Sequence, residues 1–317
     1  MQPVRLLLIF LFLSGCSVIS IDFTPRVGPL QEKTVEGSGA AKILLVDVSG
    51  VISEEPLVSL GGSHPRVSLL ARFREELQKA EEDERIRALV LRINSPGGTV
   101  TASDILYREI GAFKERRKIP VIATIMDVGA SGGYYVALAA DAIVAHPTSI
   151  TGSIGVMMLT LNAEGLLRKV GVTPLTIKSG EKKDMGAPFR GLTEEERAIF
   201  QSVIDDLHSR FISLISKERR LPEERVRALA DGRIYTARRA LELGLVDRVG
   251  YLEEGVELAK RAAGTAEARI VMYHRPREYR SNLYSSAQPP ERLDFPLVQL
   301  SGLLLGPGPR FLYLWWP

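Results

Sequence analysis

The sequence predicts an α/β fold built on a mostly parallel sheet. From residue 42 to residue 177, apolar runs typical of buried strands alternate with amphipathic stretches of helical spacing. This alternation favours parallel strands, because each helix carries the chain back to the start of the next strand. The composition agrees, since 45% hydrophobic and 25% charged residues are ordinary for a globular protein.

The strands of this first half are marked by unbroken runs of Val, Ile and Leu, and the helices by a spacing of three to four residues between apolar positions. A further apolar stretch, Ile154–Leu161, has no clear helix or strand pattern. The expected strands are Lys42–Val48, Ile86–Ile93, Pro120–Met126, Ala142–Ala145 and Thr173–Ile177. The expected helices are Val67–Ala80, Ala102–Arg117, one that opens at Ser131, and Asn162–Val170.

The second half is mainly helical. Thr193 precedes three glutamates, which is typical of a capped helix start, and that helix is expected to run to about Arg219. Pro222 opens the next helix, because proline is tolerated in a first turn. Two more amphipathic helices and a strand are expected at Thr236–Leu243, Leu252–Ala263 and Ala268–Tyr273.

The first fifteen residues have the layout of a secretory signal. Arg5 is followed by an apolar run and then by small residues. The run is shorter than the ~20 residues that cross a bilayer as a helix. Leu13–Cys16 (LSGC) resembles the bacterial lipobox, which implies cleavage before Cys16 and a lipid on its thiol. An uncleaved signal anchor is the alternative.

Charge and cysteine content exclude several classes of function. The 41 Lys and Arg residues nearly balance the 38 Asp and Glu residues, so no nucleic-acid partner is expected. One cysteine excludes a disulfide within the chain. Together with only four histidines, it also argues against a zinc site, and no metal is expected.

Two glycine-rich segments follow predicted strands. Asn94–Gly98 can present backbone N–H groups to an oxyanion, although a simple tight turn is the alternative. Val128–Tyr135 places Ser131 between a strand and a helix, where its hydroxyl would be exposed and the Gly132 N–H would face an oxyanion. Gly129–Gly133 fits the GxSxG spacing of a nucleophile elbow. The competing interpretation is a helix-capping serine.

A serine nucleophile needs a base. His146 and His208 have no nearby aspartate in a pattern that would orient an imidazole, and such histidines are more often structural. A lysine whose pKa is lowered by burial is the alternative. Lys178–Asp184 supplies lysines and follows a predicted strand, but its composition alone fits a solvated turn.

Five motifs in order give the chain a family resemblance over roughly residues 42–272. It resembles the short form of bacterial signal peptide peptidase A, a group of membrane-associated serine endopeptidases with a Ser/Lys dyad. The motifs are Asn94–Gly98, Gly129–Tyr135, Thr151–Val156, Ser179–Asp184 and Ala230–Tyr235.

The resemblance implies a role for each matching residue. Ser131 falls on the nucleophile, Lys183 on the general base, and Ser153 on the serine that helps to hold the lysine. Lys182 competes with Lys183 for the same place. The oxyanion hole falls on Gly98 or Gly97 together with Gly132.

The resemblance also implies a fold, a setting and partners. The fold is crotonase/Clp-like, with repeated strand-strand-helix units and added C-terminal helices. No cofactor is implied. Expected partners are peptide substrates such as cleaved signal peptides, a membrane reached through the N-terminal lipid or anchor, and further copies in a ring. The expected location is the bacterial cell envelope, outside the cytoplasm.

The expected organisation has four parts. A lipoprotein-type signal covers residues 1–15 and a tether residues 16–41. A peptidase domain covers residues 42–273, and a Pro/Ser-rich, aromatic tail covers residues 274–317. This tail is expected to pack on a partner subunit, to insert into a membrane interface or to remain disordered. A non-catalytic lipoprotein scaffold and a crotonase-like acyl-CoA enzyme are the alternative functions.

Overall fold

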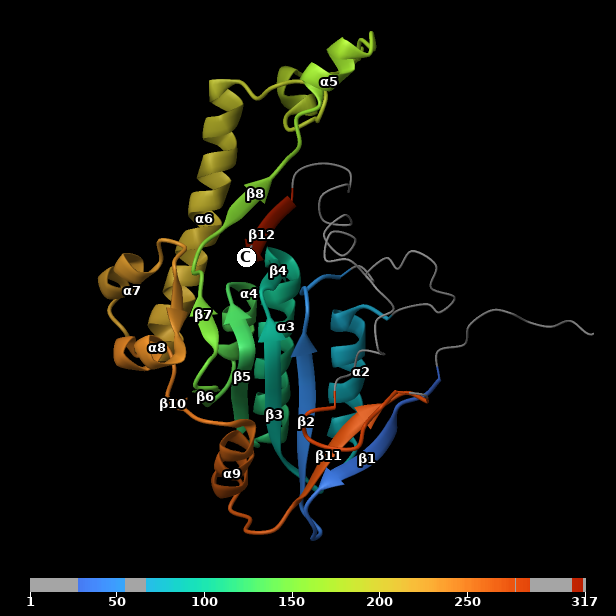
Figure 1. Ribbon diagram of the computed structural model, residues 1–317, viewed down its shortest axis with the longest axis vertical. Helices are drawn as coiled ribbons and strands as arrows, with labels where there is room; N and C mark the ends of the chain where they lie inside the picture. Colours follow the sequence, from blue (N-terminus) through green and yellow to red (C-terminus); the bar gives the residue numbers. More distant parts are fainter. Residues whose placement is uncertain (1–27, 55–66, 277, 286–309, 316–317) are drawn as a thin grey trace, which may run out of the picture.

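The structure is a computed structural model that describes residues 28–54, 67–276, 278–285 and 310–315 (Figure 1). It contains two sheets and a set of flanking helices. The strands are β1 (Gln31–Glu36), β2 (Lys42–Ser49), β3 (Ile86–Ser95), β4 (Gly97–Thr99), β5 (Val121–Ala130), β6 (Ala142–Ala145), β7 (Ile150–Gly152), β8 (Met157–Leu159), β9 (Ile234–Thr236), β10 (Arg248–Val249), β11 (Arg269–His274) and β12 (Arg310–Leu314).

The main sheet confirms the predicted α/β class. Its strands follow the order β1-β11-β2-β3-β5-β6-β10, and β7 pairs with both β5 and β9. All neighbours are parallel except β1 with β11 and β7 with β9. The second sheet has three antiparallel strands in the order β4-β12-β8.

Helices cover both faces of the main sheet. Helices α2, α3 and α4 pack on one face and α9 on the other, while α6 extends along the side (Figure 1). The helices are α2 (Leu69–Glu81), α3 (Val100–Arg117), α4 (Gly132–Ala137), α5 (Glu164–Lys169), the 3-10 helix η1 (Glu181–Asp184), α6 (Glu194–Arg219), α7 (Glu223–Leu229), α8 (Ala237–Leu243) and α9 (Leu252–Ala262).

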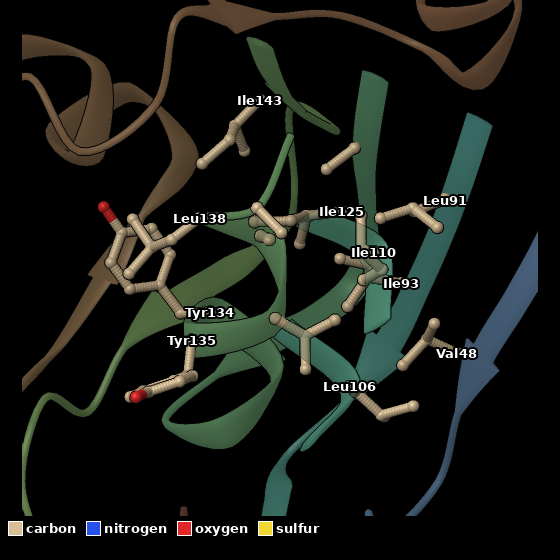
Figure 2. Packing of buried hydrophobic residues seen from close by; sticks show 14 of the residues in the cluster. Val48, Leu91, Ile93, Leu106, Ile110, Ile125, Tyr134, Tyr135, Leu138 and Ile143 are labelled. Carbon is tan, nitrogen blue, oxygen red and sulfur yellow. The ribbon is translucent and has the colours of Figure 1, made fainter. Parts of the chain in front are cut away.

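The alternating side chains of the strands build two cores. In β2, Leu44 and Val46 face the cluster that includes α2 and α3, whereas Ile43 packs with α9 on the other face. Figure 2 shows the larger core, in which Ile110 of α3 packs with Ile93 of β3. Both faces of these strands are buried, which explains their unbroken apolar runs.

The strands and helices of the sheet core, and most helices of the second half, lie where the sequence predicted them. The cap at Thr193 is a full capping box, in which Thr193 and Glu196 satisfy each other's backbone N–H groups. Pro222 precedes the first residue of α7.

Three predictions need correction. Thr173–Ile177 forms no strand, and Leu175 and Ile177 are exposed, because the apolar alternation has no neighbouring strand to pair with. Gln31–Glu36, assigned to the tether, forms β1 and pairs with β11. Part of the C-terminal tail forms β12 and packs inside the domain, because its alternating residues find two strand partners there.

The predicted signal and the lipidation site Cys16 lie outside the described residues. Within the part of the chain that the structure describes, no helix has both the length and the apolar character needed to cross a bilayer.

Candidate active site

The carboxyl ends of β3, β5 and β7 meet at one edge of the main sheet. In the strand register, Ser95 lies opposite Gly129, and Ala130 lies opposite Gly152. Strand β9 then joins β7, because the Ser153 N–H donates to the Arg233 carbonyl oxygen at 2.8 Å. The motifs brought together are Asn94–Gly98, Gly129–Tyr135, Thr151–Val156 and Ala230–Tyr235.

Ser131 sits on a strained turn between β5 and α4. Its φ is 50° and its ψ is −115°, a conformation that costs a non-glycine residue about 1–3 kcal/mol. Its side chain forms no capping hydrogen bond with α4, which rules out the capping interpretation. A strained serine at a strand-to-helix junction is the geometry of a nucleophile elbow, as the spacing predicted.

The sequence predicted an exposed Ser131 hydroxyl, and this prediction is wrong, because the hydroxyl is buried in the described chain. The residue is 1% exposed, and Oγ has no hydrogen-bond partner among the described residues. A buried polar atom without a partner is costly, so such atoms in native structures are often functional. The backbone is fixed instead, since the Ser131 N–H donates to the Gly152 carbonyl oxygen at 2.8 Å.

The loop after β3 lies directly beside Ser131. The Gly97 N–H donates to Ser95 Oγ at 3.1 Å, and Ser95 Oγ donates to the Gly50 carbonyl oxygen at 2.6 Å. Gly97 has φ +103°, and a Cβ built on it would come 2.7 Å from the Gly132 nitrogen. A Cβ on Gly98 would meet the Ile52 carbonyl oxygen at 1.8 Å. Both positions therefore require glycine, and Ser95 is a support that sequence reasoning did not single out.

The described chain does not bring Ser131 and Lys183 together. Lys183 lies in η1, between α5 and α6, and is exposed. Figure 1 shows α5 beyond β8, away from α4 and the sheet. Because Ser131 Oγ has no hydrogen-bond partner in the described residues, the lysine does not contact it.

Three charged neighbours of Lys183, namely Lys178, Lys182 and Asp184, are already paired. Lys178 Nζ donates to Asp184 at 2.7 Å, and Arg190 also binds Asp184 at 2.7 Å, which together hold the pKa of that carboxyl well below its usual range. Lys182 donates to Glu195, and this hydrogen bond raises the pKa of the Lys182 ammonium. No described residue forms a hydrogen bond or ion pair with the Lys183 ammonium, so Lys183 is the lysine available to another partner.

Neither histidine candidate reaches the serine. His146 interacts with Thr148, and its ring packs edge-on against Tyr251. His208 lies within α6, and its Nε2 is buried without a partner in the described residues. Among those residues, no group of three His, Cys, Asp or Glu side chains is placed to hold a metal ion.

Sequence comparison assigns the chain to a family. The model of the family described as "Peptidase family S49" matches residues 113–266, which include Ser131, Ser153 and Lys183. A protein named signal peptide peptidase SppA from Enterococcus faecium is 35% identical over 243 residues, covering 77% of this chain and 70% of the relative. The chain belongs to peptidase family S49.

Two further comparisons give matches. A protein of Methanocaldococcus jannaschii named protease MJ0651 is 34% identical over 275 residues, covering 86% of this chain and 87% of the relative. Among solved structures, a ClpP1 variant from Listeria monocytogenes matches 67% of this chain and 94% of its own, with 18% identity and a TM-score of 0.43.

Family membership makes the chain a serine endopeptidase. Of the functions considered from the sequence, it favours the peptidase over the non-catalytic scaffold and over the acyl-CoA enzyme. The local geometry agrees. Ser131 is strained and buried, and it lies beside the turn that contains Gly97 and Gly98, an arrangement that suits nucleophilic attack on a carbonyl.

Proposed function

We propose that this chain is a membrane-anchored endopeptidase that uses Ser131 as nucleophile and Lys183 as general base to degrade signal-peptide remnants and other peptides near a membrane. The observation that carries the proposal is Ser131, whose backbone is strained and whose hydroxyl is buried without a hydrogen-bond partner among the described residues. It lies beside the glycines that can receive an oxyanion.

The proposed reaction begins with proton transfer from the Ser131 hydroxyl to the neutral Lys183 amine. The serine oxygen attacks the peptide carbonyl carbon, and the carbonyl electrons move to oxygen. Amide groups of Gly98 and Gly132 hold this oxyanion, each worth about 3 kcal/mol. The Gly97 amide supports the loop, since it already donates to Ser95. Lys183 then protonates the leaving amine, and water releases the acyl group in the second half of the reaction.

A second copy of the chain completes the proposed dyad. Lys183 is exposed on the segment between β8 and α6, while Ser131 is buried at the sheet edge. The same segment exposes Leu166, Val170 and Ile177, apolar side chains that suit a contact between copies. Burial between subunits would also lower the pKa of the lysine, which a general base needs near pH 7. We therefore propose a homo-oligomeric ring.

The substrate class and the membrane rest on other support. A relative of which this chain covers 70% carries the name signal peptide peptidase. The lipobox-like Leu13–Cys16 offers an anchor that places the domain in the bacterial cell envelope. Mass analysis of the mature N-terminus tests this point: a lipid on Cys16 supports the anchor, and an intact Met1 contradicts it.

Peptide hydrolysis by the purified full chain tests the mechanism. The variants Ser131→Ala and Lys183→Ala are expected to lose at least about 10³-fold in kcat/KM. Lys182→Ala is the matched control, because Lys182 is paired with Glu195, and it should keep most of the activity. Activity lost in Lys182→Ala and kept in Lys183→Ala would overturn the base assignment, and full activity in Ser131→Ala would overturn the nucleophile.

A further inference from the structure

The motif Ala230–Tyr235 has no role in the proposed reaction. It forms a turn at residues 231–233 and the strand β9, which pairs antiparallel with β7. Strand β7 runs parallel beside β5, the strand that ends directly before Ser131 (Figure 1). One strand, β7, therefore separates the motif from the strand that leads to the nucleophile.

The carboxylate of Asp231 fixes the turn at residues 231–233. The Arg233 N–H donates to Asp231 Oδ1 at 3.1 Å, and Arg233 Nε donates to the same oxygen at 2.8 Å. Gly232, between them, has φ +88°, a conformation that residues with a side chain rarely adopt. An aspartate that binds the backbone two residues further on stabilises a turn of this kind. The carboxylate therefore holds the backbone of Arg233 in place.

Two backbone hydrogen bonds join this turn to Ser153. The Ser153 N–H donates to the Arg233 carbonyl oxygen at 2.8 Å, and the Gly232 N–H donates to the Ile154 carbonyl oxygen at 3.2 Å. Ser153 has φ 48°, which is unfavourable for a residue other than glycine. Such a conformation persists only where its surroundings enforce it. The turn contributes the two hydrogen bonds that bracket Ser153.

Gly152 connects the same turn to the nucleophile. A Cβ built on Gly152 would lie 2.6 Å from the Tyr235 ring and 3.0 Å from the Arg233 carbonyl oxygen, so the motif covers this residue closely. The Gly152 carbonyl oxygen accepts the Ser131 N–H at 2.8 Å. The Tyr235 ring is held as well, because its hydroxyl donates to the Leu229 carbonyl oxygen at 2.9 Å. A shift of the turn would therefore move the peptide group that anchors Ser131.

The side chains of Asp231 and Arg233 are themselves exposed to solvent. Asp231 is 46% exposed and Arg233 is 64% exposed, and an ion pair of this kind contributes little to the stability of a fold. The carboxylate nevertheless begins a series of hydrogen bonds and close contacts that ends at Ser153 and Ser131. Loss of the carboxylate should therefore affect the geometry of the site more than the stability of the protein.

We propose that Asp231 is a positioning residue of the peptidase. Through the turn at residues 231–233 it holds Ser153 in place and, by way of Gly152, it fixes the backbone of Ser131. The turn thereby sets the separation of the two serines and the place that the lysine amine must occupy. This inference rests on the proposed function, because it takes both serines to serve the same proton transfer.

Peptide hydrolysis by the full chain tests the inference with two variants of Asp231. Asp231→Ala should lower kcat about tenfold and leave KM within about twofold, because the reacting groups shift while the substrate contacts remain. Asp231→Asn keeps an oxygen that can accept the Arg233 N–H, and it should recover most of the wild-type kcat. A wild-type kcat in Asp231→Ala, or an equal loss in Asp231→Asn, would overturn the inference.

Glu242→Ala is the matched control for the loss of an exposed charge. Glu242 is also an exposed acid, but it pairs with Arg238 and Arg239 of its own helix, α8. This variant should keep the wild-type kcat, and all three variants should unfold at nearly the wild-type temperature. A loss of kcat in Glu242→Ala as large as that in Asp231→Ala would assign the effect to surface charge and would overturn the positioning role.

Hydrogen exchange separates this inference from the proposed function, because it needs no hydrolysis. In Asp231→Ala, the Ser153 and Ser131 amides should exchange about tenfold faster than in the wild type, and in Asp231→Asn at nearly the wild-type rate. Mass spectrometry with fragmentation to single residues measures both amides. Faster exchange supports the positioning role even if no variant hydrolyses peptides, a result that would defeat the proposed function alone. Unchanged exchange at both amides would overturn the inference, even in an active enzyme.

Discussion

The proposed reactivity of Ser131 depends on how the backbone holds this residue. The sequence identified the serine from small neighbours at a strand-to-helix junction, and the structure adds a positive φ and a buried, unpartnered hydroxyl. Strain of this kind persists only where the surroundings enforce it, and here the Ser131 N–H donates to the Gly152 carbonyl oxygen and fixes the turn.

The strain at Ser131 predicts that a glycine variant at this position is more stable than an alanine variant. The free energy of unfolding of Ser131→Gly should be about 1 kcal/mol higher than that of Ser131→Ala, because glycine adopts φ 50° without steric cost and alanine does not. Both variants should lack peptidase activity. Urea denaturation of the two proteins measures the difference. Equal stabilities, or a less stable glycine variant, would show that the turn stores no strain.

Residue types alone indicated Ser131 as a candidate nucleophile, but they did not indicate its base. The turn at Ser131 has a local signature, whereas a lysine base becomes visible only from its surroundings, and Lys178, Lys182 and Lys183 share one segment. The structure separates them by their partners, since Lys178 and Lys182 are ion-paired. The family resemblance supplied the preference for Lys183 that spacing alone did not.

At the element scale, the core strands and helices were predictable because their patterns are continuous and local. The strand β12 was not predicted, although Phe311–Leu314 is apolar and β-prone, because its partners lie more than 150 residues away in the chain. The opposite error arose at Thr173–Ile177, where a strand-like pattern has no neighbour in the described chain.

A buried charge cluster joins α2 to the segment after β11. Arg92 donates to the Leu283 and Ser285 carbonyl oxygens, which fixes residues 278–285 over β3. Next to it, Glu76 of α2 is 4% exposed, and its burial raises its pKa to about 7. The charged groups that face it are Arg72 of α2, Asp47 of β2, and Glu278 and Arg280 of the segment.

Glu76 predicts a pH-dependent stability. Between pH 4.5 and 7 the carboxyl is ionised in the unfolded chain and protonated in the folded one, so the folded state binds more protons and stability falls as pH rises. From pH 5 to pH 8 the loss should be about 2.5 kcal/mol relative to Glu76→Gln, which does not titrate. Urea denaturation of both proteins across this range measures it. Parallel pH profiles would contradict the buried, protonated state of Glu76.

At the level of the whole molecule, the motifs of the proposed site lie in two separate places. Four motifs meet at the sheet edge, while the motif with Lys183 lies on the segment between β8 and α6. In the proposed assembly, each copy would give its lysine to the next through a heterologous contact, and this contact would repeat around a closed ring. This arrangement is not readable from a single sequence, because it depends on which surfaces meet.

The shared site predicts complementation between inactive chains. Ser131→Ala and Lys183→Ala should each be inactive alone. When the two are co-expressed, random assortment should leave about a quarter of the sites with both intact residues, and hydrolysis should recover to about that fraction of the wild-type rate. A co-assembled mixture that stays inactive would contradict a dyad shared between subunits.

The most direct test of Ser131 as the nucleophile is covalent labelling of the intact protein with a fluorophosphonate, followed by mass analysis of its peptides. We expect one adduct, on the Ser131 oxygen, which the wild type forms and Ser131→Ala does not. An adduct on a different serine, or peptide hydrolysis that persists while Ser131 stays unmodified, would contradict the assignment of Ser131 as the nucleophile.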